Sequence, residues 1–301
     1  MDRERAAKII IRALDSTVST VFTAVLLLLL LFSAYIGVEN YRIVKEADST
    51  VYQAYKPLKD DEDSFRKLAL KNPDVIGWLT IDDTNIDYPL VQGEDNKAYI
   101  NQSVLGEFSI SWAIFLDSRN DRHFADALSV VYGHNMVGDV MFGGLHNFAD
   151  PEYFAQHLTG TLFHDGDYYQ LHVFAFFTAD GHDADVYRVG LNEQNRDEWL
   201  SQIRSIAVNY ESDAAEKGPI LLMSTCAVGE TSGRTLLAAT IEPGGMAPGA
   251  RKTETISMRV LHGMSADGEW LTWPCLLVAV IVLLALTILF YCRRNRKGDE
   301  N

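Results

Sequence analysis

The sequence predicts a mainly β domain, folded as a closed or nearly closed barrel and carried between two membrane-spanning helices. The middle of the chain contains many short segments rich in β-branched or aromatic residues, each bounded by Gly, Asp, Asn or Pro. Helical patterns are few there, and closure into a barrel removes the exposed edges that so many strands would otherwise present. A long apolar stretch lies near each end of the chain.

The two apolar stretches, residues 18–38 and 271–291, each contain 21 residues. A helix of that length extends about 31 Å and matches a hydrocarbon core of about 30 Å. A cleavable signal peptide is the alternative for the first stretch. Its apolar region exceeds the usual length of about 7–15 residues, and no small-x-small site follows at once, so we expect an uncleaved anchor.

Basic residues flank both stretches on their terminal sides. Because positive residues stay on the cytoplasmic side, we expect a two-pass protein of the cell membrane with both termini in the cytoplasm and residues 39–270 outside. The flanking residues are Arg3, Arg5, Lys8, Arg12, Arg293, Arg294, Arg296 and Lys297.

The exported part is acidic, with 36 Asp and Glu residues against 18 Lys and Arg residues. This charge argues against nucleic acid or anionic lipid as the partner. A soluble exported domain whose charge repels its neighbours is enough to explain the charge itself.

Residues 39–270 are enough for one domain with its own core. The expected strands read VIGWLTI, IDYPLVQ, WAIFLD, LSVVYG, YYQLHVFAFFTA, PILLMSTC, RTLLAATI and ETISMRVL. The expected helices cover 38–58, 61–72, 138–148, 151–158 and 192–210. The resulting divisions are a basic tail at 1–17, a span at 18–38, a helical stem at 39–72, the barrel at 73–262, a linker at 263–270, a span at 271–291 and a basic tail at 292–301.

One cysteine, Cys226, lies in the exported part, because Cys275 and Cys292 belong to the second span and its edge. An unpaired thiol in an oxidising compartment invites a functional explanation, although a free Cys on a strand is most often a small buried hydrophobe. The strand PILLMSTC ends at Cys226, and a hairpin returns Arg234 beside it. Arg234 there would favour the thiolate or stabilise an oxyanion; it could equally be a solvated hairpin residue.

A nucleophilic cysteine also needs an imidazole partner. Among the eight histidines, His134 is distinctive because it follows the apolar strand LSVVYG, so that it too is held at a strand end. The others lie in polar, helical or mid-strand surroundings. No HxxxH or HExxH spacing supports a metal site.

These residues resemble the sortases, membrane-anchored cysteine transpeptidases of Gram-positive bacteria. The segment LLMSTC…R is similar to the sortase TLSTC…R motif, with Met223 where Leu is usual. The segments YGHNM…MFGGL, NPDVIGWLTI…IDYPLVQGEDNKAYIN and AIFLDSRN resemble class B sortases in particular. The resemblance covers roughly residues 64–262.

The resemblance implies an eight-stranded barrel with added helices and a two-step transpeptidation without a cofactor. Cys226 would attack the carbonyl of a Thr in the C-terminal sorting signal of a surface protein, and an amine would resolve the thioester. That amine would come from a peptidoglycan precursor's cross-bridge, which anchors the protein to the cell wall, or from a pilin Lys. His134 would transfer the protons, and Arg234 would hold the oxyanion.

The resemblance also implies a peptide-binding set, namely Asn96, Ile100, Tyr187, Ser224 and Thr225. The alternatives are ordinary: Ile100 could belong to the core, Asn96 to a turn, and Thr225 could be a β-branched strand residue.

The second span departs from the class B pattern, because a C-terminal span is typical of sortases that polymerise pilins. Those enzymes usually carry an Asp-Pro-aromatic lid motif, and NPDV is not that motif. Three alternatives to wall anchoring therefore stay open: a class B-type pilin polymerase, a thiol hydrolase that releases the peptide to water, and a doubly anchored binding or sensor domain in which Cys226 is only packed.

Overall fold

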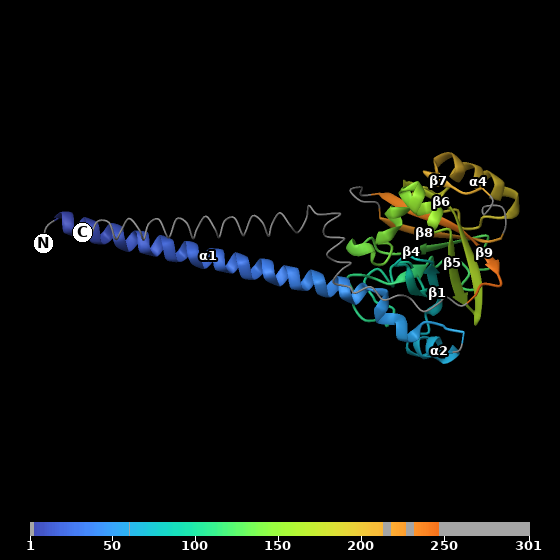
Figure 1. The fold of residues 1–301 in the computed structure, drawn as a ribbon, viewed down its shortest axis with the longest axis horizontal. Coiled ribbons are helices and arrows are strands. Elements are labelled where there is room, and N and C mark those ends of the chain that lie inside the picture. The colour runs from blue at the N-terminus through green and yellow to red at the C-terminus, as the bar shows by residue number, and fades with distance from the viewer. Residues whose placement is uncertain (1–2, 60, 213–217, 227–231, 247–301) are drawn as a thin grey trace. The chain divides into compact units, whose positions relative to one another are not determined.

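The computed structural model describes residues 3–59, 61–212, 218–226 and 232–246 (Figure 1). Within these ranges the chain forms two compact units, divided between Arg42 and Ile43. The expected second span, the segments that flank it and the expected strand ETISMRVL lie outside the described residues.

The first unit is a helix, α1 (Arg3–Ala47), whose last residues belong to the second unit. Its most apolar stretch has a mean hydropathy of 2.5, and none of that stretch is buried. By length and composition α1 can cross a membrane and act as an anchor. The helix expected at 38–58 is not continuous, however. It stops before Asp48, whose carboxylate accepts a hydrogen bond from the Thr50 amide (2.8 Å) and caps a separate 3₁₀ helix, η1 (Ser49–Tyr55).

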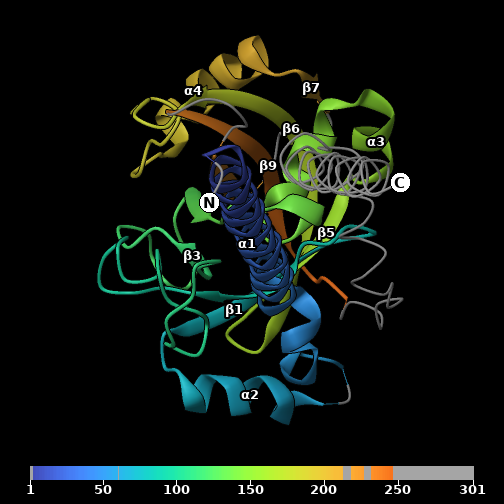
Figure 2. The same cartoon turned by 90° about the vertical axis from the view of Figure 1, so that its left-hand side faces the viewer.

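The second unit is an eight-stranded barrel with helices, as the resemblance implies. The sheet runs in the order β5-β1-β2-β3-β4-β8-β9-β6-β7, and pairing of β5 with β6 closes it, which leaves β7 outside the ring (Figure 2). The strands are β1 (Val75–Ile81), β2 (Asp87–Val91), β3 (Ile114–Leu116), β4 (Leu128–Tyr132), β5 (Thr159–His164), β6 (Asp167–Asp180), β7 (Asn209–Tyr210), β8 (Ile220–Cys226) and β9 (Gly233–Pro243).

The helices largely follow the sequence expectation. They are α2 (Glu62–Lys71), η2 (Val137–Asp139), η3 (Gly143–Ala149), α3 (Pro151–Gln156) and α4 (Glu193–Ile206). Besides the break at Asp48, three features differ from the expectation. β5 was not expected, and the helix expected at 138–148 is two short 3₁₀ helices separated by residues 140–142. The helix expected at 192–210 ends at Ile206, so that Asn209 and Tyr210 pair with β6.

The strands of the barrel separate two hydrophobic clusters. Along β8, Leu221 and Met223 join the larger cluster, whereas Ile220 and Leu222 join a second cluster that includes Trp199 of α4. This is the two-residue period of a strand that is buried on both faces. Helix α4 thus covers one face of the β4-β8-β9-β6 part of the sheet.

Asp87 joins the segment after α1 to the barrel. Its carboxylate lies 2.9 Å from the ammonium of Lys56, and both side chains are 3% exposed. It also accepts hydrogen bonds from Gln53, Trp78 and Thr80. Burial alone would raise the pKa of Asp87, but Lys56 and these donors outweigh burial and hold the pKa below its usual value. The pair therefore stabilises the fold fully at a pH above the usual pKa of Asp. This contribution is lost as the pH falls through the lowered pKa that Asp87 has in the folded protein.

We expect Asp87→Asn to lower the free energy of unfolding by about 3–5 kcal/mol, because it leaves Lys56 charged and buried without a counter-charge. The matched control is Asp63→Asn, which breaks an exposed ion pair between Asp63 and Arg66. The Asp63 side chain is 67% exposed and the Arg66 side chain is 73% exposed. The control should cost about 1 kcal/mol or less. Urea unfolding of both variants measures the difference, and equal losses would contradict this account.

Candidate active site

Three neighbouring strands bring the predicted catalytic residues to one end of the barrel. β4 pairs with β8 in parallel, with Tyr132 opposite Ser224. β8 pairs with β9 in antiparallel fashion, with Cys226 opposite Arg234. The Gly133 amide donates to the Ser224 carbonyl (3.1 Å) and extends this pairing up to His134. The backbone positions of Cys226, His134 and Arg234 therefore lie at the same edge of the sheet.

His134 is half-buried at the start of a tight loop. Its carbonyl accepts from the Phe142 amide (3.0 Å), which closes the loop over residues 134–142. Gly133 permits this closure, because a Cβ there would lie 2.6 Å from the Phe142 ring. The imidazole stacks on the indole of Trp112 with ring centroids 4.5 Å apart. Burial lowers the pKa of His134, so the neutral imidazole is favoured at neutral pH.

Arg234 is half-buried between two strands, opposite Ala179 of β6 as well as Cys226 of β8. Its Nη1 donates to the Gly233 carbonyl (2.9 Å), and the side chain makes no ion pair with any described residue. A Cβ at residue 181 would lie 3.0 Å from both Cζ and Nε of Arg234, so Gly181 leaves the space that the guanidinium occupies. The Arg234 guanidinium therefore contacts the backbone of residues 181 and 233 and is partly screened from solvent.

Behind these strand ends, Ser224 and two tyrosines are linked by hydrogen bonds and ring stacking. The hydroxyls of Tyr187 and Ser224 are 2.8 Å apart, and Tyr187 stacks on Tyr132. Tyr132 donates to the carboxylate of Asp117 (3.0 Å), which also accepts two hydrogen bonds from the Arg119 guanidinium and one from the Arg119 amide. Burial and then the charge of Asp117 raise the pKa of Tyr132, so its hydroxyl stays protonated.

The remaining predicted binding residues have different surroundings. Asn96 accepts a hydrogen bond from the Ser118 amide (2.7 Å), which ties its loop to the end of β3. Ile100 is 38% exposed and does not belong to the core. Thr225 is buried, and its hydroxyl has no hydrogen-bond partner among the described residues.

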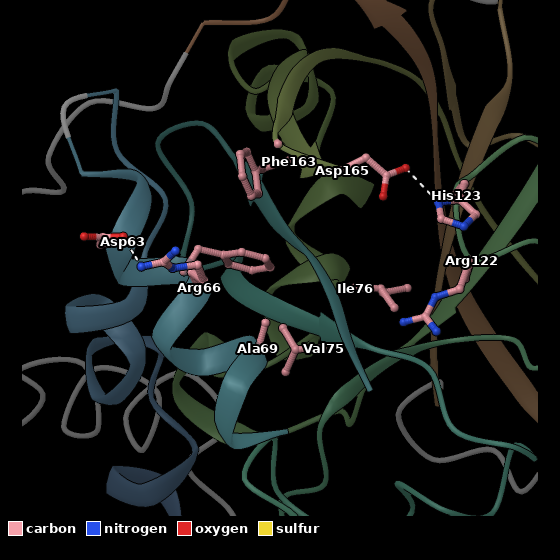
Figure 3. Close-up of a pocket in the computed structure, with 11 residues that line it drawn as sticks. Asp63, Arg66, Ala69, Val75, Ile76, Arg122, His123, Phe163 and Asp165 are labelled. Atoms are coloured by element: carbon pink, nitrogen blue, oxygen red, sulfur yellow. Dashed lines mark hydrogen bonds and ion pairs between the residues drawn. The ribbon is translucent and has the colours of Figure 1, made fainter. Parts of the chain in front are cut away.

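A cavity of about 660 Å³ lies elsewhere, between α2, the start of β1 and the β5–β6 turn (Figure 3). Phe65, Ile76 and Phe163 contribute apolar surface, and His123 pairs with Asp165 at its rim. β6 runs from this turn to Asp180 beside Arg234, so the cavity and the candidate site lie at opposite ends of that strand. Among the described residues, no group of three or more His, Cys, Asp or Glu side chains is arranged to hold a metal ion.

The sequence did not reveal four residues that shape this site, namely Trp112, Asp117, Tyr132 and Gly181. Tyr132 could have been found, because it is the last residue of β4 and precedes His134 by two residues. The others reach the site through tertiary contacts.

No family model matches the chain. Sortase B of Listeria monocytogenes is 31% identical over 169 residues, which cover 54% of this chain and 67% of that relative. A solved class B sortase of Streptococcus pyogenes involved in pilus biogenesis is 36% identical, with a TM-score of 0.55, over 60% of this chain and 100% of that chain.

Two further solved structures agree. Sortase B from the type II pilus of Streptococcus pneumoniae is 35% identical (TM-score 0.51), covering 59% of this chain and 98% of that chain. A mutant form of sortase B from Clostridium perfringens is 28% identical (TM-score 0.60), covering 64% and 96%. The chain belongs to the class B sortases, and it is a transpeptidase of that family with the sortase barrel.

We expect Tyr187→Phe to lower the free energy of unfolding by about 1–3 kcal/mol, because it leaves the buried Ser224 hydroxyl without its hydrogen bond. The double variant Tyr187→Phe, Ser224→Ala removes both polar groups and should recover part of that loss. Urea unfolding of the two single variants and the double variant measures the coupling. Strictly additive losses would contradict a direct interaction.

Proposed function

We propose that this class B sortase cleaves a C-terminal sorting signal after Thr and transfers the protein to an amine, with Cys226 as nucleophile, His134 as general acid and base, and Arg234 at the oxyanion. The observation that carries the proposal is the register of the strands. β9 pairs with β8 so that Arg234 lies opposite Cys226, and the neighbouring strand β4 ends at Tyr132, two residues before His134. The resemblance of the surrounding motifs to the sortases supports the same assignment.

In the first step neutral His134 takes the proton of the Cys226 thiol and becomes the imidazolium. The resulting thiolate attacks the threonine carbonyl carbon, and the carbonyl π electrons become an oxyanion. The Arg234 guanidinium donates hydrogen bonds to that oxyanion and balances its charge. The C–N bond then breaks, and the departing amine takes a proton from the His134 imidazolium. The product is a thioester between Cys226 and the surface protein.

In the second step an incoming amine attacks the thioester carbonyl and gives a proton to neutral His134. Collapse of this second tetrahedral intermediate forms an amide and expels the Cys226 thiolate. The lowered pKa of His134 suits it to accept this proton at neutral pH.

The sorting peptide is proposed to bind along Asn96, Ile100 and the strand end at Ser224 and Thr225, with Tyr187 as a further contact. The exposed surface of Ile100 supports this placement. Ser224 and Tyr187 contribute through their mutual hydrogen bond, which fixes the strand next to Cys226.

The chain is further proposed to cross the membrane twice, through residues 18–38 and 271–291, with residues 39–270 outside the cell. The apolar helix α1 and the basic residues on the terminal sides of both stretches support this arrangement.

We expect the full-length protein in detergent micelles to join threonine-containing sorting peptides to an added amine. Cys226→Ala should abolish transfer and the thioester adduct, and His134→Ala should abolish transfer. Arg234→Lys should lower transfer at least about tenfold because bidentate geometry is lost. Mass spectrometry detects the amide, the thioester and the free acid.

The matched control is Arg204→Lys on α4, where the guanidinium lies over the Tyr210 ring, and it should retain normal transfer. Free acid in place of amide would instead identify a thiol hydrolase. Absence of any adduct on Cys226 would favour the binding or sensor domain.

Pilus assembly is the second candidate function. Two of the solved relatives are pilus sortases, at 36% and 35% identity. The second apolar stretch of the chain, at 271–291, also agrees with the pattern of sortases that polymerise pilins.

A competition between two amines separates the two functions. The full-length enzyme receives one sorting peptide with equal amounts of a peptide bearing a Lys side chain and a peptide bearing a cross-bridge amine. Pilus assembly predicts that the Lys product exceeds the cross-bridge product about tenfold or more, which corresponds to about 1.4 kcal/mol of discrimination. An excess of the cross-bridge product would contradict pilus assembly and retain wall anchoring.

A further inference from the structure

Trp112 has an unusual backbone conformation close to the candidate site. It lies in the long connection between β2 and β3, two residues before β3 begins, and its φ is +66°. A bulky residue at positive φ is strained and persists only where the surrounding structure holds it there. The contact that this conformation provides is the stacking of the indole on the His134 imidazole, at 4.5 Å between centroids and 26° between planes.

His134 differs from the other described histidines in how its ring is held. The rings of His123, His146, His157, His164 and His182 each have a polar contact at Nδ1, and His172 has one at Nε2. The Nδ1 atom of His134 is buried and has no hydrogen-bond partner among the described residues. A catalytic histidine is usually oriented by a hydrogen bond at that atom.

We propose that Trp112 is the positioning residue for His134, and that its flat indole face replaces the usual hydrogen bond in orienting the imidazole. The proposal rests on the proposed function, because it takes His134 as the group that transfers protons. In this role Trp112 acts through the imidazole and is not a catalytic residue.

Stacking suits a ring that must accept and release a proton in each cycle. The indole contacts a face of the imidazole and not its edge, so the stack itself occupies neither ring nitrogen. Burial favours the neutral ring, whereas the aromatic face attracts the imidazolium, so both forms required by the two steps keep the same orientation. Burial is the cause of the lowered His134 pKa among the described residues, and the proposed function adds the Cys226 thiol and the Arg234 guanidinium as ionisable groups that act with this ring.

The test compares Trp112→Leu, which keeps apolar bulk without an aromatic face, with Trp112→Phe, which keeps a smaller aromatic face. The control is Phe108→Ala in the same connection, whose side chain is 79% exposed. All are made in the full-length protein in detergent micelles. We expect Trp112→Leu to lower kcat for transfer about tenfold or more with KM within about twofold, because a misplaced catalytic group slows chemistry. Trp112→Phe should recover most of kcat, and Phe108→Ala should match the wild type.

A second readout does not depend on turnover. NMR titration of His134 should give a higher pKa in Trp112→Leu than in the wild type, because release from burial outweighs the lost attraction between the aromatic face and the imidazolium. Trp112→Phe should give an intermediate value. If the wild type transfers no peptide, the proposed function fails and this titration still tests the stack. An unchanged kcat, a change confined to KM, no recovery in Trp112→Phe, or an unchanged His134 titration would each overturn the proposal.

Discussion

The register between β8 and β9 is the constraint on which the candidate site depends. The two strands pair without a shift from Ile220 opposite Thr240 to Cys226 opposite Arg234. A slip of one residue would turn every side chain of β8 to the other face. Such a slip would exchange Met223 and Leu222 between the two hydrophobic clusters, and would place Ser224 where it cannot meet Tyr187. Burial along the strands thus fixes which residues meet at their ends.

The sequence predicts the strands well where burial is continuous. β1 and β8 are runs of β-branched and aliphatic residues, and their bounds differ little from those expected. β5 was missed because its segment, TGTLFH, mixes Gly, Thr and His, and becomes a strand through its pairing with β1 and β6. The break of the first helix at Asp48 was also missed, although a capping Asp before Ser and Thr is a local signal for a new helix start.

The residues of the candidate site also divide into those that the sequence predicts and those that it does not. Cys226, His134 and Arg234 are visible in the sequence because each lies next to the end of an apolar strand, and strand ends can be read locally. Trp112 and Gly181 act through contacts that no local pattern encodes: an indole from a long connection meets an imidazole, and a missing Cβ makes room for a guanidinium. Residues of this kind are found only when the fold is known.

The ion pair of Lys56 and Asp87 has a practical consequence for the boundaries of the folding unit. The residues of η1 and Lys56 precede the barrel in sequence, yet Gln53 and Lys56 supply two of the donors that surround a carboxylate inside it. A shortened chain that starts after Lys56 would enclose a lone negative charge beside Trp78. A water-soluble version freed from its anchor should therefore begin upstream of Ser49, so that the segment between helix and barrel is retained as an integral part of the domain.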